Sequence, residues 1–223
     1  MAYILNIETS TTNCSVSLSH KGETLVLKED YGNGYSHAEK LHVYVDEVLK
    51  EAKISTLQLD AIAVSKGPGS YTGLRIGVSA AKGLAFALNI PLISVSTLEA
   101  LAHQVKADSG LIIPMLDARR LEVYSAIFDT QFNSIRAIEA QVLDETSFQS
   151  YLSENKVYFI GDGVSKTKAL IDNNNAVFIE NKLPSADQMS ALSFNKYKKS
   201  DTEDVAYFEP YYLKDFVAIK SKK

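Results

Sequence analysis

The sequence is poor in cysteine and has no excess of positive charge. Cys14 is the only cysteine among 223 residues, which excludes an intrachain disulfide and a cysteine-based metal site and fits a reduced, cytosolic compartment. The formal net charge is -4 and the isoelectric point about 5.6. Because phosphate binding depends on clustered Lys and Arg, this balance argues against a protein that grips nucleic acid through its own basic surface. Any contact with nucleic acid should be local or shared with a partner.

Long apolar runs are also missing. No segment approaches the roughly twenty apolar residues of a membrane span, and the N-terminus has no basic stretch followed by an apolar run and a cleavage site. We expect a soluble, cytoplasmic protein with no membrane partner. With 46% hydrophobic residues, the chain can bury a core as one large or two modest domains.

A glycine-dense loop lies between the apolar segment 61–65 and a helix rich in small residues. Its sequence is Gly67-Pro68-Gly69-Ser70-Tyr71-Thr72-Gly73-Leu74-Arg75-Ile76-Gly77. Glycines at a helix N-terminus first suggest a cradle for an anion. The spacing meets neither common phosphate motif, because Leu74 replaces the Lys of a P-loop and the third glycine falls one residue late for a dinucleotide fingerprint.

The loop resembles the signature GPGSxTGLRIG of the TsaB (YeaZ-type) family, in the actin, heat-shock and sugar-kinase (ASKHA) superfamily. The stretch 4–11 is similar to the family's opening strand and turn, and 116–124 to its DARRxEVY stretch. Weaker support comes from 161–163 and 210–214. The resemblance implies an α/β fold of two actin-like (ribonuclease H-like) domains, the second of them reduced.

The hydrophobic pattern predicts the same opening for both halves: a strand ending in an acid, a turn, a strand, a hairpin and a third strand. We expect the strands of the first half at 3–7, 14–19 and 24–28, and those of the second at 111–116, 122–128 and 134–142. The polar break at 106–110 marks the predicted boundary between an N-terminal domain, 1–106, and a reduced C-terminal domain, 107–223.

Helices and further strands should fill the rest of both halves. Gly32 and Gly34 break the chain, and Ser36 is expected to cap a helix to Ala52, with Glu39 completing a capping box. Strands are predicted at 59–65, 92–95, 157–160 and 176–179, and helices at 74–88, 97–105, 146–153, after 163 and at 185–197. We expect the tail from Asp201 to be irregular and partly loose.

The helix 74–88 is apolar around most of its circumference. Only Arg75, Ser79 and Lys82 are polar, and they form one narrow stripe. Such a helix is either buried within its own protein or covered by a second one. In a chain of this size we favour a partner surface, and burial by the chain's own elements is the alternative.

Two acids, Glu8 and Asp117, each follow the first strand of a half. The resemblance implies positions that face phosphates in active kinases of the superfamily, where the pair would do general acid/base work. The alternative is that each acid satisfies the backbone of its turn. We favour the alternative and predict no catalytic residue, because active members have Asp at position 8 and because Arg119 and Arg120 could neutralise Asp117.

Metal and nucleophile sites find little support. His37 and His42 are five residues apart and turn to different helix faces, while Thr97 and Leu101 occupy the places of the His-x-x-x-His metal pair of the related TsaD. We predict no metal site. Ser70 and Cys14 have no neighbouring base in sequence, and 161–163 is interpreted as a tight strand-to-helix connection.

The resemblance implies a non-catalytic partner and scaffold of TsaD in the biosynthesis of threonylcarbamoyladenosine, the modified adenosine beside the tRNA anticodon. TsaE would join the complex, TsaC would be functionally linked, and tRNA would be reached through the complex. The chain alone would bind no cofactor, and ATP at the interface with TsaD and a homodimer are left open. The alternative is an active small-molecule kinase or ATPase of the superfamily; a metallopeptidase is a third hypothesis.

Two groups of site residues follow from these interpretations. The vestigial phosphate site is predicted to comprise Glu8, Ser10, Thr11, Gly67, Gly69, Ser70, Gly73 and Asp117. The partner interface, on the helices that begin near Ser36 and Leu74, is predicted to comprise Arg75, Ile76, Ser79, Ala80, Lys82, Gly83, Ala87, Leu41 and Val45.

Overall fold

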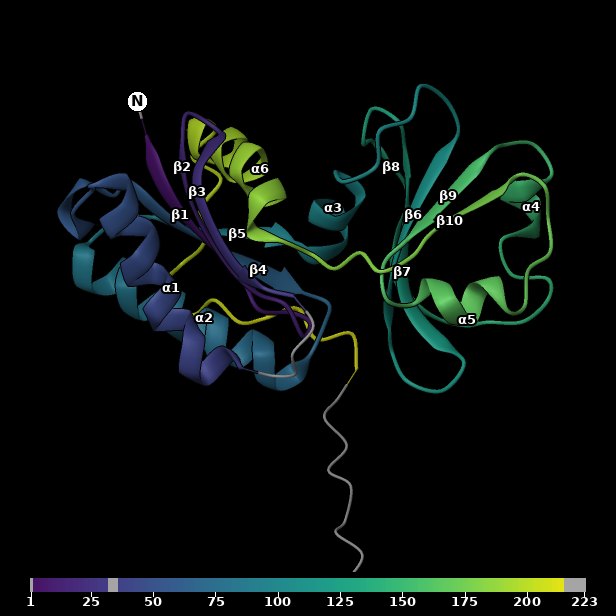
Figure 1. The fold of residues 1–223 in the computed structure, drawn as a ribbon, viewed down its shortest axis with the longest axis horizontal. Helices are drawn as coiled ribbons and strands as arrows, with labels where there is room; N and C mark the ends of the chain where they lie inside the picture. Colours follow the sequence, from purple (N-terminus) through teal and green to yellow (C-terminus); the bar gives the residue numbers. More distant parts are fainter. Residues whose placement is uncertain (1, 32–35, 215–223) are drawn as a thin grey trace, which may run out of the picture.

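The computed structural model describes residues 2–31 and 36–214 and shows two five-stranded sheets set side by side, each covered by helices (Figure 1). The strand orders are β3-β2-β1-β4-β5 in the first sheet and β10-β9-β6-β7-β8 in the second. In both sheets a meander of three antiparallel strands is extended by parallel strands. The predicted α/β class with two lobes is confirmed.

Side chains along the strands of the first sheet alternate between its two faces. Its strands are β1 (Tyr3–Glu8), β2 (Cys14–His20), β3 (Glu23–Asp30), β4 (Ala61–Gly67) and β5 (Leu92–Ser96). Leu5 and Ile7 of β1 point to one core and Ile4 to another, as a period of two requires. Both faces are therefore buried, and each needs its own layer of helices.

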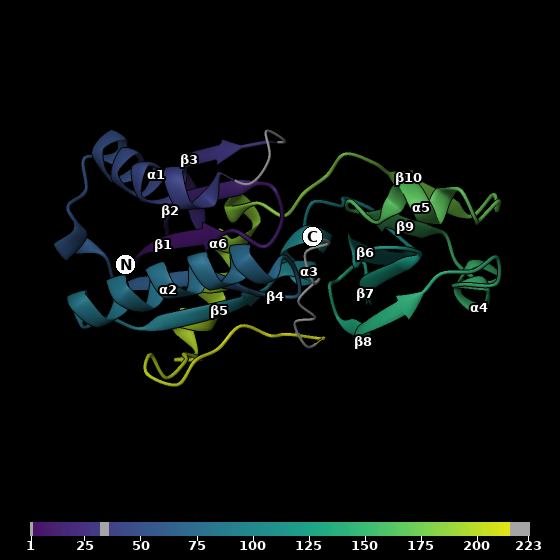
Figure 2. The same ribbon diagram turned by 90° about the horizontal axis from the view of Figure 1, so that it is seen from below.

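Helices cover both faces of this sheet (Figures 1 and 2). The helices α1 (His37–Ala52) and α2 (Tyr71–Leu88) lie side by side on one face, and α6 (Ala186–Lys198) lies on the other. Two short elements lie in connections: the 3-10 turn η1 (Thr56–Gln58) between α1 and β4, and α3 (Thr97–Ala102) between β5 and β6. Within the described residues, no helix is long and apolar enough to cross a membrane.

The second sheet repeats the opening plan with less helical cover. Its strands are β6 (Leu111–Asp117), β7 (Glu122–Asp129), β8 (Ser134–Val142), β9 (Val157–Ile160) and β10 (Ala176–Ile179), and its helices α4 (Gln149–Leu152) and α5 (Val164–Lys168) are short. Its core gathers around Phe159, which stacks on Phe178 with ring centroids 5.3 Å apart. The predicted reduction of the second lobe is visible in these short helices.

Several element boundaries differ from the predicted ones for local reasons. Helix α2 begins at Tyr71 because Ser70 caps it, its hydroxyl accepting the Gly73 amide at 3.3 Å. The predicted capping box at Ser36 is wrong, since that hydroxyl donates to the carboxylate of Asp30 instead. The predicted break at Gly32 and Gly34 lies outside the described residues.

The division into consecutive domains at residue 107 is also corrected. After β10 the chain returns to the first sheet, where Met189 of α6 joins the core formed by Ile4 and Ile93. The hydroxyl of Ser193 donates to the Asn6 side chain at 2.7 Å, which fixes the helix on β1. The first lobe thus includes α6 and the tail that follows it.

The tail is irregular as predicted, but its described part, 201–214, is anchored. The Glu203 amide donates to the Leu92 carbonyl at 2.8 Å, and the Tyr211 amide to the Lys66 carbonyl at 2.7 Å. The expectation of a loose tail is wrong for these residues. We call residues 203–214 the strap.

Candidate functional site

The glycine loop packs directly onto the turn that follows β1. A Cβ on Gly69 would come closer than 3.0 Å to the Ser10 carbonyl oxygen, and one on Gly73 equally close to the carbonyl oxygen of Thr9. Such distances essentially never occur, so both positions need glycine. The Thr9 hydroxyl donates to the Gly73 carbonyl at 2.8 Å and closes the contact.

Several polar groups of this region pair with the backbone, although the buried Ser10 hydroxyl has no partner among the described residues. The Ser70 amide donates to the Ser10 carbonyl at 2.6 Å, and the Ser70 side chain caps α2. Thr11 accepts the Asn13 amide through its hydroxyl, and its carbonyl accepts the Nε2-H of His37 at 2.7 Å. The loop and the turn after β1 therefore form one packed unit, in which the chain's own atoms fill the space that a phosphate cradle would leave open.

Glu8 is fully buried beneath this unit. Its Oε1 accepts the Ser10 amide at 2.6 Å and the Ser65 hydroxyl at 3.0 Å, while its Oε2 has no partner among the residues that the structure describes. Burial raises the pKa of Glu8, and the hydrogen bonds from Ser10 and Ser65 only partly oppose that rise. This environment matches the interpretation in which the acid satisfies its turn.

Asp117 has a different, exposed environment at the end of β6. Its Oδ1 accepts the Arg119 amide at 2.5 Å and pairs with the Lys166 amine at 2.9 Å. The partner that neutralises it is therefore Lys166 of α5, and neither of the predicted arginine side chains. Asp162 accepts the Asp117 amide at 2.8 Å, and burial raises the pKa of Asp162.

The stretch 161–163 is the tight connection that the sequence suggested. Gly161 has φ 123°, and a Cβ there would come closer than 3.0 Å to the Met115 carbonyl oxygen. The turn thus packs against β6 through its backbone. Within the described residues, no three His, Cys, Asp or Glu side chains are grouped so as to hold a metal ion.

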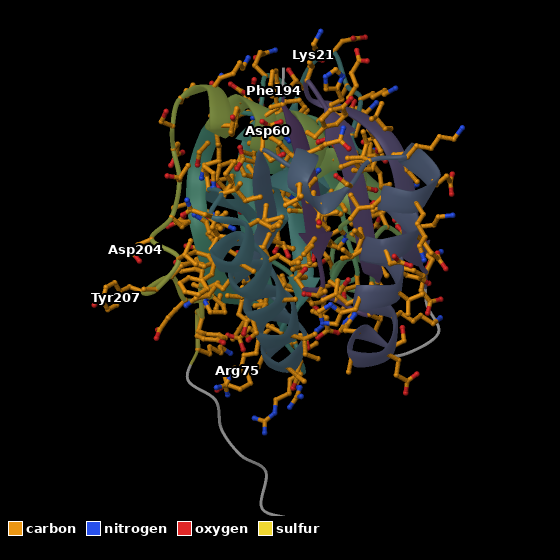
Figure 3. All side chains as sticks on the ribbon, turned by 90° about the vertical axis from the view of Figure 1, so that its left-hand side faces the viewer. Lys21, Asp60, Arg75, Phe194, Asp204 and Tyr207 are labelled. Atoms are coloured by element: carbon orange, nitrogen blue, oxygen red, sulfur yellow. The ribbon has the colours of Figure 1, made fainter. Side chains whose placement is uncertain are left out.

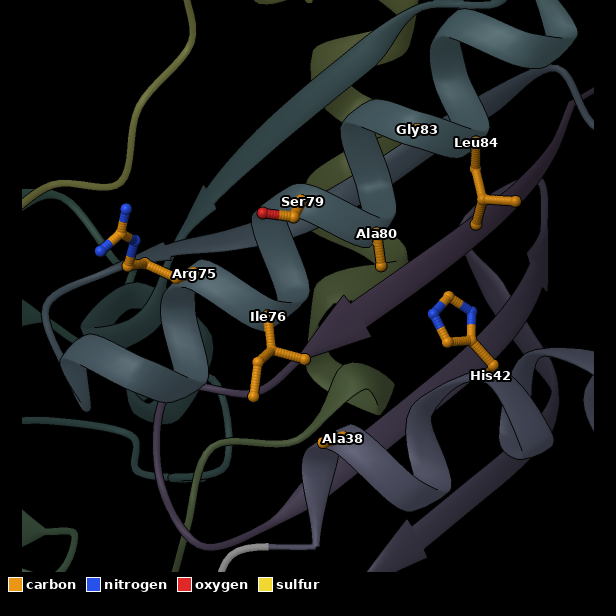
Figure 4. Close-up of a pocket in the computed structure, with 8 residues that line it drawn as sticks. All are labelled: Ala38, His42, Arg75, Ile76, Ser79, Ala80, Gly83 and Leu84. Carbon is orange, nitrogen blue, oxygen red and sulfur yellow. The ribbon is translucent and has the colours of Figure 1, made fainter.

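Helix α2 presents an open groove beside α1 (Figure 4). The groove has a volume of about 660 Å³ and is lined from α2 by small and aliphatic side chains and from α1 by Ala38 and His42. Four predicted interface residues, Ile76, Ser79, Ala80 and Gly83, lie in it, and Arg75 lies at its end. The structure therefore brings five predicted residues together on one surface.

Four predicted interface residues lie outside the groove lining. One of them, Ala87, is exposed near the C-terminal end of α2. Leu41 is fully buried and Val45 is 8% exposed, because both face the first sheet within the core. A second molecule cannot reach them, so their assignment to the interface is corrected. Lys82 donates to the Ala206 and Phe208 carbonyls of the strap, at 3.1 and 2.8 Å.

The strap covers one flank of α2, which sequence reasoning missed. Val205 and Phe208 pack against the core beneath α2, and the rings of Tyr71 and Tyr212 lie 5.0 Å apart. Further out, Tyr207 projects away from the body of the protein (Figure 3). Its side chain is 85% exposed. Part of the apolar surplus of α2 is thus buried by the chain itself, and the groove flank remains open.

Comparison with known proteins agrees with this architecture. The family model described as TsaD: tRNA N6-adenosine threonylcarbamoyltransferase matches residues 33–222. The tRNA threonylcarbamoyladenosine biosynthesis protein TsaB of Bacillus subtilis is 32% identical over 216 residues, covering 95% of this chain and 93% of that protein. The chain belongs to the TsaB family. The resemblance noted from the glycine loop is confirmed.

Other members of the TsaB family extend the match over the whole length. The Haemophilus influenzae TsaB is 29% identical over 232 residues, covering 97% of this chain and 95% of that protein. The structure of YeaZ from Pseudomonas aeruginosa superposes with a TM-score of 0.81 at 28% identity, covering 96% of this chain and 100% of that one. The two-lobed arrangement is therefore that of known TsaB-family structures.

Proposed function

We propose that this chain takes part in the biosynthesis of threonylcarbamoyladenosine in tRNA as a non-catalytic partner of TsaD. TsaD would bind along the groove between α1 and α2, TsaE would join the complex, and TsaC would act in the same modification. The tRNA would be reached through the complex. In the absence of TsaD, the same groove would pair two copies of the chain.

The observation that carries the proposal is the closed contact between the glycine loop and the turn after β1. Glycines that served a phosphate would keep a space open, whereas a Cβ on Gly69 or Gly73 would meet the backbone of residues 9 and 10. These residues do not fit a nucleotide phosphate at that place. We therefore assign no cofactor to the chain alone and place any ATP at the interface with TsaD.

The groove supplies the surface that such a partner needs. Its α2 side carries small residues, so a facing backbone can come close, and Arg75 and His42 add polar groups to its lining. Since Leu41 and Val45 already support the groove from the core, its shape is set before a partner arrives. Preorganisation lowers the entropy that association costs.

A pair of arginine substitutions tests the docking surface. Ala80→Arg places a charge in the groove, whereas Ala191→Arg places it on the exposed side of α6 and is the matched control. We expect Ala80→Arg to weaken co-purification with TsaD of the same organism by at least about tenfold, because an unpaired charge is desolvated at the interface. The control should co-purify normally.

The cellular readout is the modified nucleoside itself, measured by mass spectrometry of tRNA digests. Depletion of the chain should lower its level, and the wild type and Ala191→Arg should restore it while Ala80→Arg should not. Normal nucleoside levels after depletion would reject the proposed pathway. Normal co-purification of Ala80→Arg would reject the groove as the docking site.

The alternative, an active small-molecule kinase or ATPase, makes a different prediction. It needs Glu8 and Asp117 to act on a bound phosphate, yet Glu8 is buried under the loop and Asp117 is paired with Lys166. Hydrolysis of ATP by the purified chain that is lost in Glu8→Ala would favour this alternative over the scaffold role.

A further inference from the structure

The turn between β6 and β7 holds two consecutive arginines in the left-handed backbone conformation. Arg119 has φ 70° and Arg120 φ 52°, and they are the only two consecutive non-glycine residues with positive φ within 2–31 and 36–214. This conformation is unfavourable for residues with a Cβ, and Gly, Asn or Asp adopt it more easily. The hairpin between β2 and β3 also has two consecutive residues with positive φ, Lys21 and Gly22, but the second of them is a glycine.

Hydrogen bonds to the backbone of the turn, from main-chain and side-chain groups, fix this strained shape. The Arg119 amide donates to the Asp117 carboxylate at 2.5 Å, and the Glu122 amide donates to the Arg119 carbonyl at 3.1 Å. The Lys166 amine donates to the Arg120 carbonyl at 2.7 Å. The fold thus holds two arginine side chains outward from a rigid turn, and both residues are exposed.

The two carboxylates at the ends of the turn, those of Asp117 and Glu122, are ion-paired within the chain. Asp117 pairs with Lys166, Glu122 pairs with Lys214 of the strap, and the Asp162 carboxylate accepts the Asp117 amide. In the described part of the chain, neither guanidinium has a hydrogen-bond or ion-pair partner. Four cations thus face three carboxyl groups, which leaves the turn positive on a chain of net charge -4.

We propose that Arg119 and Arg120 bind phosphate groups of an RNA backbone. A guanidinium donates two parallel hydrogen bonds to a phosphate, and arginines on a rigid turn lose little freedom on binding. An acidic protein surface is disfavoured, because interface cores are apolar and the turn offers few exposed apolar side chains, Leu121 and the neighbouring Val142, among its charged groups. The inference rests on the proposed function, with tRNA as the RNA.

A turn-compatible variant separates charge from backbone geometry. Arg119→Asn with Arg120→Gly supplies residues that favour positive φ and removes both charges, while Arg119→Lys with Arg120→Lys keeps the charges. Lys198→Ala with Lys199→Ala removes two charges from the exposed end of α6 and is the matched control. The affinity of each variant for unmodified tRNA is measured by fluorescence anisotropy, with the variant assembled with TsaD. The salt concentration is varied from about 50 to about 300 mM, because counterion release makes the affinity of phosphate contacts depend on salt.

We expect the Asn-Gly variant to bind tRNA about tenfold more weakly and to lower the salt slope, d log K/d log[salt], by about 1.5, the value for two phosphate contacts. Its melting temperature should equal or exceed that of the wild type. The Lys-Lys variant should keep most of the slope, and the α6 control should match the wild type.

Three results would overturn the inference. Unchanged tRNA affinity and slope in the Asn-Gly variant would show that the arginines do not touch RNA. Loss of TsaD co-purification in that variant would place them in a protein interface instead. A lower melting temperature of the Asn-Gly variant would show that the two arginines stabilise the turn, so that their presence needs no binding role. None of these results bears on Ala80→Arg, so the proposed function is tested independently.

Discussion

Two glycine-to-alanine substitutions on the same helix should change stability in opposite directions. Gly73 and Gly83 both lie in α2, but a Cβ on Gly73 would overlap the Thr9 carbonyl oxygen, whereas one on Gly83 would meet nothing within 4 Å. Replacing glycine by alanine in a helix gains about 0.5–1 kcal/mol through backbone entropy. The two sites share this gain and differ in packing.

The size of the effect follows from the atom that the new Cβ meets. A carbonyl oxygen of the backbone cannot rotate away, so Gly73→Ala should reach the upper part of the usual overpacking cost of about 1–3 kcal/mol. After the helix gain is subtracted, about 2 kcal/mol of destabilisation remains, or roughly 4–8 °C in a chain of this length. Gly83→Ala should raise the melting temperature by about 1–4 °C.

Thermal unfolding followed by circular dichroism and urea denaturation both measure this difference. A phosphate cradle would predict that Gly73→Ala folds normally and loses only anion binding. If Gly73→Ala were as stable as the wild type, the contact between loop and turn would not explain the glycines. A destabilised Gly83→Ala would show that the open side of α2 is packed after all.

Two more predictions concern Glu8 and the strap. The pKa of Glu8 is raised in the folded state, so the stability that its protonated form contributes is present below the unfolded pKa, about 4.5, and is lost as pH rises through the folded pKa. Glu8→Gln should flatten this loss when urea midpoints are measured against pH. An unchanged pH profile in the variant would contradict the prediction. Lys82→Met removes two hydrogen bonds to the strap, which should lower the free energy of unfolding by about 1 kcal/mol and speed proteolysis near Tyr207. Equal cleavage rates in the variant and the wild type would show that Lys82 does not hold the strap.

The sequence was sufficient for the order of strands and turns but not for the meaning of the glycine loop. Alternation with period two identified β2 and β7, and the acids at the ends of β1 and β6 marked the repeated plan. Spacing excluded the standard phosphate motifs. What fills the loop, however, is the turn at residues 9 and 10, about sixty residues earlier, and no local pattern reports that contact.

The corrected residues show a related limit. Helical periodicity placed Leu41 and Val45 correctly on one apolar face of α1, but periodicity cannot say whether that face meets its own sheet or another molecule. The strap was missed because it is held by the main-chain carbonyls of Lys66 and Leu92, groups that every residue carries. Helix α6 was not assigned to the first lobe because it packs on the second face of the first sheet. That face exists only once β1 has paired with both β2 and β4, which no local pattern reports.

The circumference of α2 divides into three stripes with different consequences for mutation. Leu74, Val78, Ala81 and Ala85 face the sheet, so a charge at Ala81 would unfold the lobe whatever its partner does. Lys82 faces the strap. The third stripe lines the groove with the half-buried Ala80 and the exposed Gly83, whose small size leaves room for a second backbone. A large residue there should therefore reduce association without reducing stability, which separates docking from folding within a single helix.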